Sequence, residues 1–190
     1  MTKTDDNELS ELLDEIKDSL HPKIQRKKIR VLIFGPEKKT NKPSALLRQY
    51  IIKKCRKDEY TVVIAEHKKI IQLYEKIFGP ANDLCNMEYH LVKDIVDGVV
   101  IIPDSAGSFI ELGMFTLNDN LHSKILVLFN KEHNKDMASN FIGLGAKTAY
   151  DNGSARTKVL DYGNKKAAWE EVSGFLSFRK GKKYWKAVNS

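Results

Sequence analysis

Asp-Gly-Val-Val-Ile-Ile-Pro-Asp-Ser-Ala-Gly-Ser-Phe-Ile-Glu-Leu-Gly-Met-Phe, residues 97–115, is the segment from which the predicted architecture follows. Val99–Ile102 is a short apolar run of the kind that forms a strand buried on both faces. The chain then turns through Pro103–Gly107 and enters an apolar-periodic segment that predicts a helix. Because ligands bind at the carboxyl ends of strands in open α/β sheets, this strand-to-helix corner is the predicted binding site.

The start of this helix carries a capping pattern. Ser108 is the predicted N-cap, because Glu111 three residues later completes the Ser-x-x-Glu pattern of a capping box. Gly107 allows a ligand to approach the backbone closely, and the N–H groups of a helix start favour an anionic group. Glu111 and Asp104 would place two carboxylates at one sugar-binding crevice, which suits glycosidic chemistry. The alternative interpretation is that Glu111 only caps its helix and that Asp104 is an ordinary turn residue.

Strands and helices alternate along the rest of the chain. Strands are predicted at residues 29–36, 60–65, 124–129 and 157–162, and helices at residues 43–52, 70–78, 86–96 and 167–178. This alternation predicts a flavodoxin-like or Rossmann-like three-layer α/β sandwich with a central parallel five-stranded sheet. Phe34 and Gly35, at the carboxyl end of the first strand, would face the predicted crevice, with a tight turn as the alternative.

Three regions are predicted. Residues 1–28 comprise an N-terminal helix and a basic linker, residues 29–178 form the α/β domain, and residues 179–190 form a basic, aromatic tail. Asn140, in a weaker segment of the domain, is predicted to close the site or to reach a neighbouring subunit, with loop packing as the alternative. The N-terminal helix is amphipathic, because its apolar residues recur at helical spacing: Leu9, Leu12, Leu13, Ile16 and Leu20.

The formal net charge of +7 hides an asymmetry between the ends of the chain. Residues 1–20 carry seven acidic residues against two lysines, a net charge of −5, whereas residues 179–186 carry five cationic residues and no acid, a net charge of +5. Opposite charges predict that the ends contact each other or a partner, and a basic protein is drawn to polyanions. The cations and aromatics of residues 179–186 suit nucleic-acid contact by phosphate binding and base stacking. A solvated, lysine-rich surface is the plainer interpretation.

The composition excludes several classes of protein. Hydrophobic residues make up 42% of the 190 residues, which is enough for a packed domain. No apolar run reaches the roughly 18 residues that span a bilayer, so no membrane segment is predicted. The polar, acidic start of the chain is unlike a signal peptide. Cys55 and Cys85 are predicted to be reduced thiols, and the histidines lack metal-ligand spacing, so no metal site is predicted.

Residues 100–115, Val-Ile-Ile-Pro-Asp-Ser-Ala-Gly-Ser-Phe-Ile-Glu-Leu-Gly-Met-Phe, resemble the signature of the nucleoside 2-deoxyribosyltransferase-like superfamily. Within that superfamily, the segment is most similar to the effector subunits of bacterial retron antiphage systems. The polar run Asn118–Leu121, the strand Lys124–Phe129 and the segment Ser139–Gly145 fit the same variant. The resemblance covers about residues 94–150 and is only architectural over residues 29–93.

The resemblance implies a flavodoxin-like fold and an N-glycosidase activity. In the superfamily, a glutamate at the position of Glu111 attacks or stabilises C1′ of a ribose, and an aspartate at the position of Asp104 holds ribose hydroxyls. Ser105, Gly107 and Ser108 would line the phosphate or ribose side of the substrate. Retron members are similar in depleting NAD or cleaving nucleotides. The resemblance therefore implies a toxic antiphage effector that takes NAD or a (deoxy)nucleotide as its substrate and uses no cofactor.

Two other functions remain open. One is a non-catalytic subunit that senses a nucleotide or associates with nucleic acid. The other is a deoxyribosyltransferase of base salvage, but such enzymes hold the base with an aromatic residue soon after the first strand. Here that region is Phe34–Glu37, and spacing assigns the role neither to Phe34 nor to Tyr50. The implied partners are a retron reverse transcriptase with its RNA–DNA hybrid, and a second copy of the chain in a homo-oligomer. The implied location is the bacterial cytoplasm.

Overall fold

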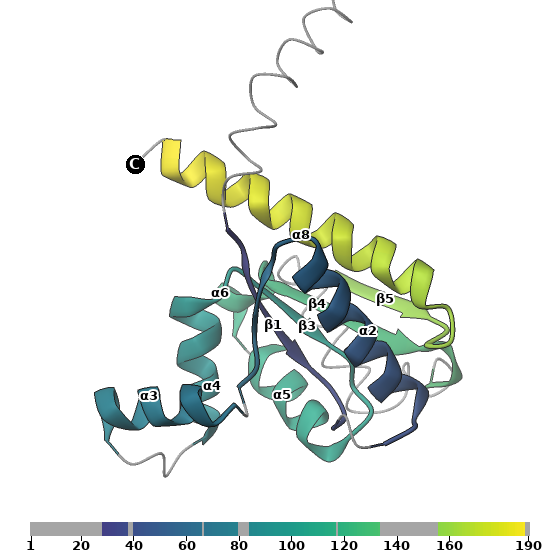
Figure 1. Ribbon diagram of the computed structural model, residues 1–190, viewed down its shortest axis with the longest axis horizontal. Helices are drawn as coiled ribbons and strands as arrows, with labels where there is room; N and C mark the ends of the chain where they lie inside the picture. The colour runs from purple at the N-terminus through teal and green to yellow at the C-terminus, as the bar shows by residue number, and fades with distance from the viewer. Residues whose placement is uncertain are drawn as a thin grey trace, which may run out of the picture.

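The computed structural model describes residues 28–37, 40–65, 67–79, 84–116, 118–133 and 156–188. In these residues, five parallel strands form one sheet with helices on both faces (Figure 1). This confirms the predicted three-layer α/β sandwich. The strands are β1 (Arg30–Phe34), β2 (Thr61–Val63), β3 (Gly98–Ile101), β4 (Ile125–Asn130) and β5 (Arg156–Leu160).

The strands lie in the order β2-β1-β3-β4-β5. After β1 the chain forms β2 on one side, and it then returns past β1 to form β3 on the other side. The connections that follow β1 and β3 therefore leave in opposite directions, and in open sheets ligands bind at this switch point. Phe34 pairs with Ile101 in the register of the two strands, so that Gly35 and Ile102 come next, at the switch point itself.

Helices cover both faces of the sheet (Figure 1). One face carries α2 (Pro43–Lys57) and α8 (Lys165–Val188). The other face carries α5 (Ala106–Thr116), α6 (Asp119–His122) and α4 (Leu84–His90), which continues as the π-helix η1 (Leu91–Ile95). The helix α3 (Lys68–Phe78) lies beside α4, and the 3-10 turn η2 (Lys131–His133) follows β4.

The apolar residues of the three central strands, β1, β3 and β4, are buried on both faces, as their continuous apolar runs predict, whereas β2 and β5 at the edges of the sheet are only partly buried. In β1, Val31 and Ile33 pack with α2 and α8, whereas Leu32 and Phe34 pack with α5 and η1. Each of these four side chains is at most 2% exposed. The core therefore consists of two halves, one on each side of the sheet, and their shared sheet fixes the positions of the strand ends.

The predicted helix of residues 86–96 is present, but its second half is the π-helix η1. Lys124 closes this end, because its Nζ donates to the carbonyl oxygens of Val92, Lys93 and Val96 at 3.0, 2.8 and 3.1 Å. These bonds satisfy carbonyl groups that a helix end leaves without an intrahelical donor. Burial lowers the pKa of Lys124, since its ammonium group is partly removed from water.

The last helix does not end where we predicted. We expected an end at Phe178 and a separate tail, but α8 continues to Val188. Contacts with the edge of the sheet at which the strands begin, which we call the amino edge, explain the longer helix. Arg179 donates from Nε to the backbone oxygen of Asp97 at 2.7 Å and from Nη1 to that of Ser123 at 3.0 Å. Burial lowers the pKa of Arg179, and the charge of Asp97 opposes this shift.

Lys183 adds a second attachment of α8 to the amino edge. Its Nζ donates to Oδ2 of Asp97 at 2.9 Å and to the backbone oxygen of Lys28 at 2.9 Å. The same carboxylate oxygen accepts the backbone N–H of Arg30 at 2.9 Å. Asp97 thus joins the starts of β1 and β3 to α8. Arg179 and Lys183, two of the five cations in the predicted tail, therefore serve the fold itself.

Some predictions concern residues outside the described ranges, among them the N-terminal helix of residues 9–20, and Asn140. Within the described ranges, none of the helices is long and apolar enough to cross a membrane. The same residues include no group of three or more His, Cys, Asp or Glu arranged to hold a metal ion. Cys55 and Cys85 are free thiols, and burial raises the pKa of Cys55 to about 12.

Candidate active site

Two connections meet at the carboxyl ends of β1 and β3. The first leaves β1 through Gly35 and leads into α2, and the second leaves β3 through Pro103 and leads into α5. We call the polar and glycine residues of these connections, with the first two turns of α2 and α5, the switch-point corner. Its members are Gly35, Ser44, Arg48, Asp104, Ser105, Gly107, Ser108 and Glu111.

The cap of α5 differs from the predicted capping box. Because α5 begins at Ala106, Ser105 rather than Ser108 precedes the helix. The backbone N–H of Ser108 donates to Oγ of Ser105 at 3.3 Å, and the backbone N–H of Ser105 donates to Oγ of Ser108 at 2.9 Å. These reciprocal bonds are those of a capping box in which serine replaces the usual glutamate. The predicted Ser108–Glu111 box is therefore wrong by one turn.

Ser108 organises the turn that carries Asp104. Its Oγ also accepts the backbone N–H of Asp104 at 3.0 Å and donates to the backbone oxygen of Ser105 at 2.9 Å. Ser108 is only 2% exposed, so these bonds form away from water. The side chain that was predicted to line the substrate thus points into the fold, where it fixes the backbone of the corner.

Ser108→Ala is expected to destabilise the protein by about 1–3 kcal/mol, because it leaves two partly buried N–H groups, those of Asp104 and Ser105, without their acceptor. The midpoint of urea unfolding, followed by circular dichroism, measures the loss. Ser173→Ala, a substitution on α8 away from the corner, is the matched control and should unfold close to wild type. Equal midpoints for Ser108→Ala and wild type would contradict this account of the turn.

Glu111 lies outside the serine pair whose reciprocal bonds cap α5. It lies one turn beyond the serine pair, in α5, and is half-buried, with Oε2 shielded from solvent. The interpretation that Glu111 serves only as a capping acid is therefore not supported. Beside it, Gly107 faces open space, since a Cβ built there would meet no atom within 4 Å. The start of α5 thus leaves room for a ligand next to a glutamate that the cap does not use.

Asp104 is held by a residue that the sequence did not single out. Oγ of Ser44, a fully buried serine in the first turn of α2, donates a hydrogen bond to Oδ2 of Asp104. This bond ties the start of α2 to the end of β3 across the switch point. Burial raises the pKa of Tyr162, and the nearby negative charge of Asp104 raises it further. In the sequence, the feature that could have indicated this contact is the proline–serine pair at the start of α2, Pro43–Ser44.

Gly35 and Phe34 occupy very different environments. Gly35 has φ of +152° and lies against Ile102, so that a Cβ would come within 3.2 Å of that side chain. The Phe34 side chain is 2% exposed and packs against Phe115, with ring centroids 5.4 Å apart. Tyr50 packs against the opposite half of the core. In this structure, therefore, Phe34 and Tyr50 support the core on either side of the sheet.

Arg48 is a buried cation at the corner that sequence reasoning missed. It is 3% exposed and donates from Nε and Nη2 to the backbone oxygen of Ile33 at 3.2 and 2.9 Å, and from Nη1 to that of Pro36 at 3.3 Å. In the sequence, the feature that could have indicated this burial is the position of Arg48 in the apolar stripe of α2, next to Leu47 and Ile51. Its guanidinium group adds positive potential where an anionic ligand would bind.

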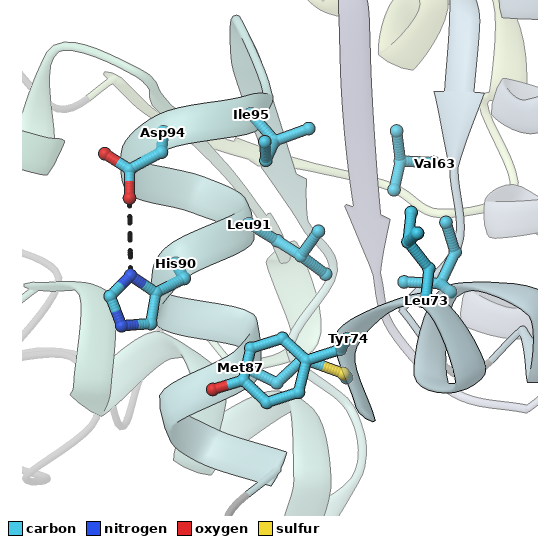
Figure 2. A pocket seen from close by; sticks show the side chains of 9 residues that line it. Val63, Leu73, Tyr74, Met87, His90, Leu91, Asp94 and Ile95 are labelled. Carbon is cyan, nitrogen blue, oxygen red and sulfur yellow. Dashed lines mark hydrogen bonds and ion pairs between the residues drawn. The ribbon is translucent and has the colours of Figure 1, made fainter. Parts of the chain in front are cut away.

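A hollow lies away from the corner, between α3 and the α4–η1 helix, beside β2 (Figure 2). It has a volume of about 190 Å³ and a largely apolar lining. At its rim, Nδ1 of His90 lies 3.3 Å from Oδ2 of Asp94. It shares no residue with the switch-point corner. The two carboxylates and the buried cation therefore make the corner, rather than this hollow, the candidate active site.

The fold defines a class: three-layer α/β proteins with the strand order β2-β1-β3-β4-β5, the order of flavodoxin-like folds, in which ligands bind at the β1–β3 switch point. The sequence model of the STM3845 retron effector protein family matches residues 44–187, so the chain belongs to that family. The match includes Ser44, Asp104 and Glu111. Retron effectors act in antiphage defence, which confirms this part of the resemblance; the link to nucleoside deoxyribosyltransferases stays a prediction. No curated protein matches the chain.

Proposed function

We propose that this retron effector is an N-glycosidase that cleaves the N-glycosidic bond of NAD or of a (deoxy)nucleotide and thereby poisons the infected cell. The observation that carries the proposal is the placement of Glu111 in α5. The Ser105–Ser108 pair caps the helix, and Glu111 lies one turn further along α5. Asp104, in the connection between β3 and α5, accepts a hydrogen bond from Ser44.

The corner offers the groups that this reaction needs. The bond between C1′ and the base nitrogen breaks, and its electron pair leaves with the base, which takes up a proton from solvent where it needs one. The carboxylate of Glu111 bonds to C1′ or stabilises its positive charge. Asp104 accepts hydrogen bonds from ribose hydroxyls. Water then adds to C1′ and loses a proton, which yields the hydrolysed sugar and restores the carboxylate.

The substrate is expected to be anionic. Arg48 is buried below the connection that follows β1, and the helices α2 and α5 both begin at the corner. Helix starts and a buried guanidinium favour phosphate groups. A salvage transferase is a weaker candidate, because the aromatic side chain after β1, Phe34, lies in the core instead of at the corner.

We further propose that the protein works with a reverse transcriptase and the RNA–DNA hybrid of its retron, and as a homo-oligomer. The family match supports the retron partner. Such partners would hold the effector silent until a phage trigger releases it, so that the purified chain and its partner complex can differ in activity.

The test is release of free base. The chain, alone and with its reverse transcriptase and RNA–DNA hybrid, is incubated with NAD and with purine and pyrimidine nucleotides, and the products are separated by liquid chromatography. We expect free nicotinamide or nucleobase together with the hydrolysed sugar. Base exchange without net hydrolysis would favour the salvage transferase. Nucleotide binding by calorimetry without turnover in any partner state would favour a sensing subunit, and both outcomes would refute the proposal.

A further inference from the structure

The C-terminal half of α8 displays aromatic and cationic side chains on one face. Phe178, Lys182, Trp185 and Lys186 follow one another at intervals of four, three and one residues, which places them along one side of a helix. We call these four residues the α8 stripe. Phe178 is 50% exposed and Trp185 is 54% exposed, although large aromatic side chains are usually well buried.

The rest of this half of α8 is fixed to the fold. Tyr184 is only 8% exposed, and Arg179 and Lys183 are bonded to the amino edge of the sheet, as described above. The helix therefore cannot easily rotate to bury the α8 stripe against its own domain. The guanidinium of Arg156 lies 4.5 Å from the Phe178 ring centroid and adds a further positive charge at this face.

The N-terminal segment of the chain leaves the fold beside the α8 stripe. The backbone oxygen of Lys28 accepts a bond from Lys183, so the N-terminal segment leaves the fold at the same height along α8 as Lys182 and Lys186, around the helix from Phe178 and Trp185. Residues 21–27 can span roughly 23 Å when extended, whereas the α8 stripe from Phe178 to Lys186 is about 12 Å long. The linker of residues 21–27 is therefore long enough for residues 9–20 to reach every member of the stripe.

The two surfaces complement each other in charge and polarity. Residues 9–20 carry leucine and isoleucine at helical spacing with acidic residues between them, and residues 1–20 have a net charge of −5. Residues 172–190 contain no acidic residue, so no acidic side chain within one helical turn of Lys182 or Lys186 offsets their charge. An amphipathic helix of this composition would cover the aromatic rings with its apolar side and pair its acids with Lys182 and Lys186.

We propose that residues 9–20 dock as a helix on the α8 stripe of the same chain. The contact buries Phe178 and Trp185 and screens Lys182 and Lys186 from other polyanions. The acidic segment is thus an internal competitor for any nucleic acid that approaches the C-terminal helix. This inference concerns the ends of the chain and is independent of the chemistry at the switch-point corner.

Trp185 reports on this contact directly. The chain has two tryptophans, so Trp169→Phe leaves Trp185 as the only one. In this full-length background, Trp185 should emit at short wavelength and resist quenching by acrylamide, a neutral quencher. Adding Leu13→Ser and Ile16→Ser is expected to shift the emission to longer wavelength and to raise the quenching constant several-fold. Adding Ser10→Ala and Lys17→Ser, which leave the leucine and isoleucine side unchanged, should have little effect.

Charge exchange provides an independent arm of the test. Lys182→Glu with Lys186→Glu should expose Trp185 as the leucine and isoleucine changes do, and Glu8→Lys with Glu15→Lys should restore its protection. Equal quenching in all variants would refute the proposal. So would protection that is lost on dilution, which indicates a second copy of the chain, or protection that appears only with added single-stranded DNA.

Discussion

Replacement of Glu111 by glutamine should lower the rate of base release by roughly 10³-fold. Glutamine has nearly the same size, so α5 should keep its packing, but it has no negative charge to attack C1′ or to stabilise an oxocarbenium-like transition state. The serine pair caps the helix without Glu111, so the substitution removes no cap. We therefore expect loss of kcat with little change in KM, measured by chromatography of released base over a range of substrate concentrations.

The control for this prediction separates chemistry from stability. Glu170→Gln removes the same charge from an exposed position on α8 and should retain wild-type activity. Thermal unfolding of Glu111→Gln and wild type should agree closely. If Glu111→Gln releases base at the wild-type rate, the glutamate has no part in the reaction. If it is inactive but also unfolds much earlier, the lost activity reflects a damaged helix instead.

The centre of the sheet was predictable because its strands β1, β3 and β4 are buried on both faces. Runs such as Val31–Phe34 and Val99–Ile102 contain no polar residue, and their short length and β-branched residues favour a strand between two helical layers over a buried helix. Alternation with helices then requires parallel pairing and crossovers of one hand. The switch point follows from that order, so the location of the candidate site was predictable as well.

The cap of α5 was not predictable, because the sequence contains two capping patterns in overlapping register. Ser105 and Ser108 are three residues apart, and so are Ser108 and Glu111. Local preference favours the second pair, since glutamate is the usual partner in a capping box. The observed register depends on where the backbone turns after β3, and the bond between Ser44 and Asp104 helps to fix that turn from another helix. A contact across 60 residues is invisible to local spacing.

The same limit explains Arg48 and the end of α8. An arginine inside an apolar stripe does not by itself predict a buried cation, because the hydrogen-bond acceptors must also be known. For Arg48 these acceptors are backbone oxygens of a different part of the chain, at Ile33 and Pro36. The basic residues after Phe178 resemble a solvated tail, yet Arg179 and Lys183 find acceptors around Asp97, more than 80 residues earlier. In both places, charged residues that look exposed in sequence are anchored by non-local partners.

Gly35→Ala should destabilise the protein by about 2–4 kcal/mol, the sum of backbone strain and steric overlap. At φ of +152° an L side chain is rarely tolerated, and the added Cβ would lie 3.2 Å from Cβ of Ile102, 3.3 Å from its backbone oxygen and 3.4 Å from Cδ of Arg48. Ile102 cannot move away freely, because its N–H donates to the backbone oxygen of Phe34 at 3.1 Å.

Gly174→Ala is the matched control for this substitution, since a Cβ at Gly174 in α8 meets no atom within 4 Å. A glycine inside a helix lowers stability relative to alanine, so this control should stabilise the protein by about 0.5–1 kcal/mol. Urea unfolding of the two variants should therefore shift in opposite directions from wild type. If Gly35→Ala unfolds at or above the wild-type midpoint, β1 and β3 are not as close at their carboxyl ends as Gly35 and Ile102 indicate. The switch-point corner would then have more room than its present contacts allow.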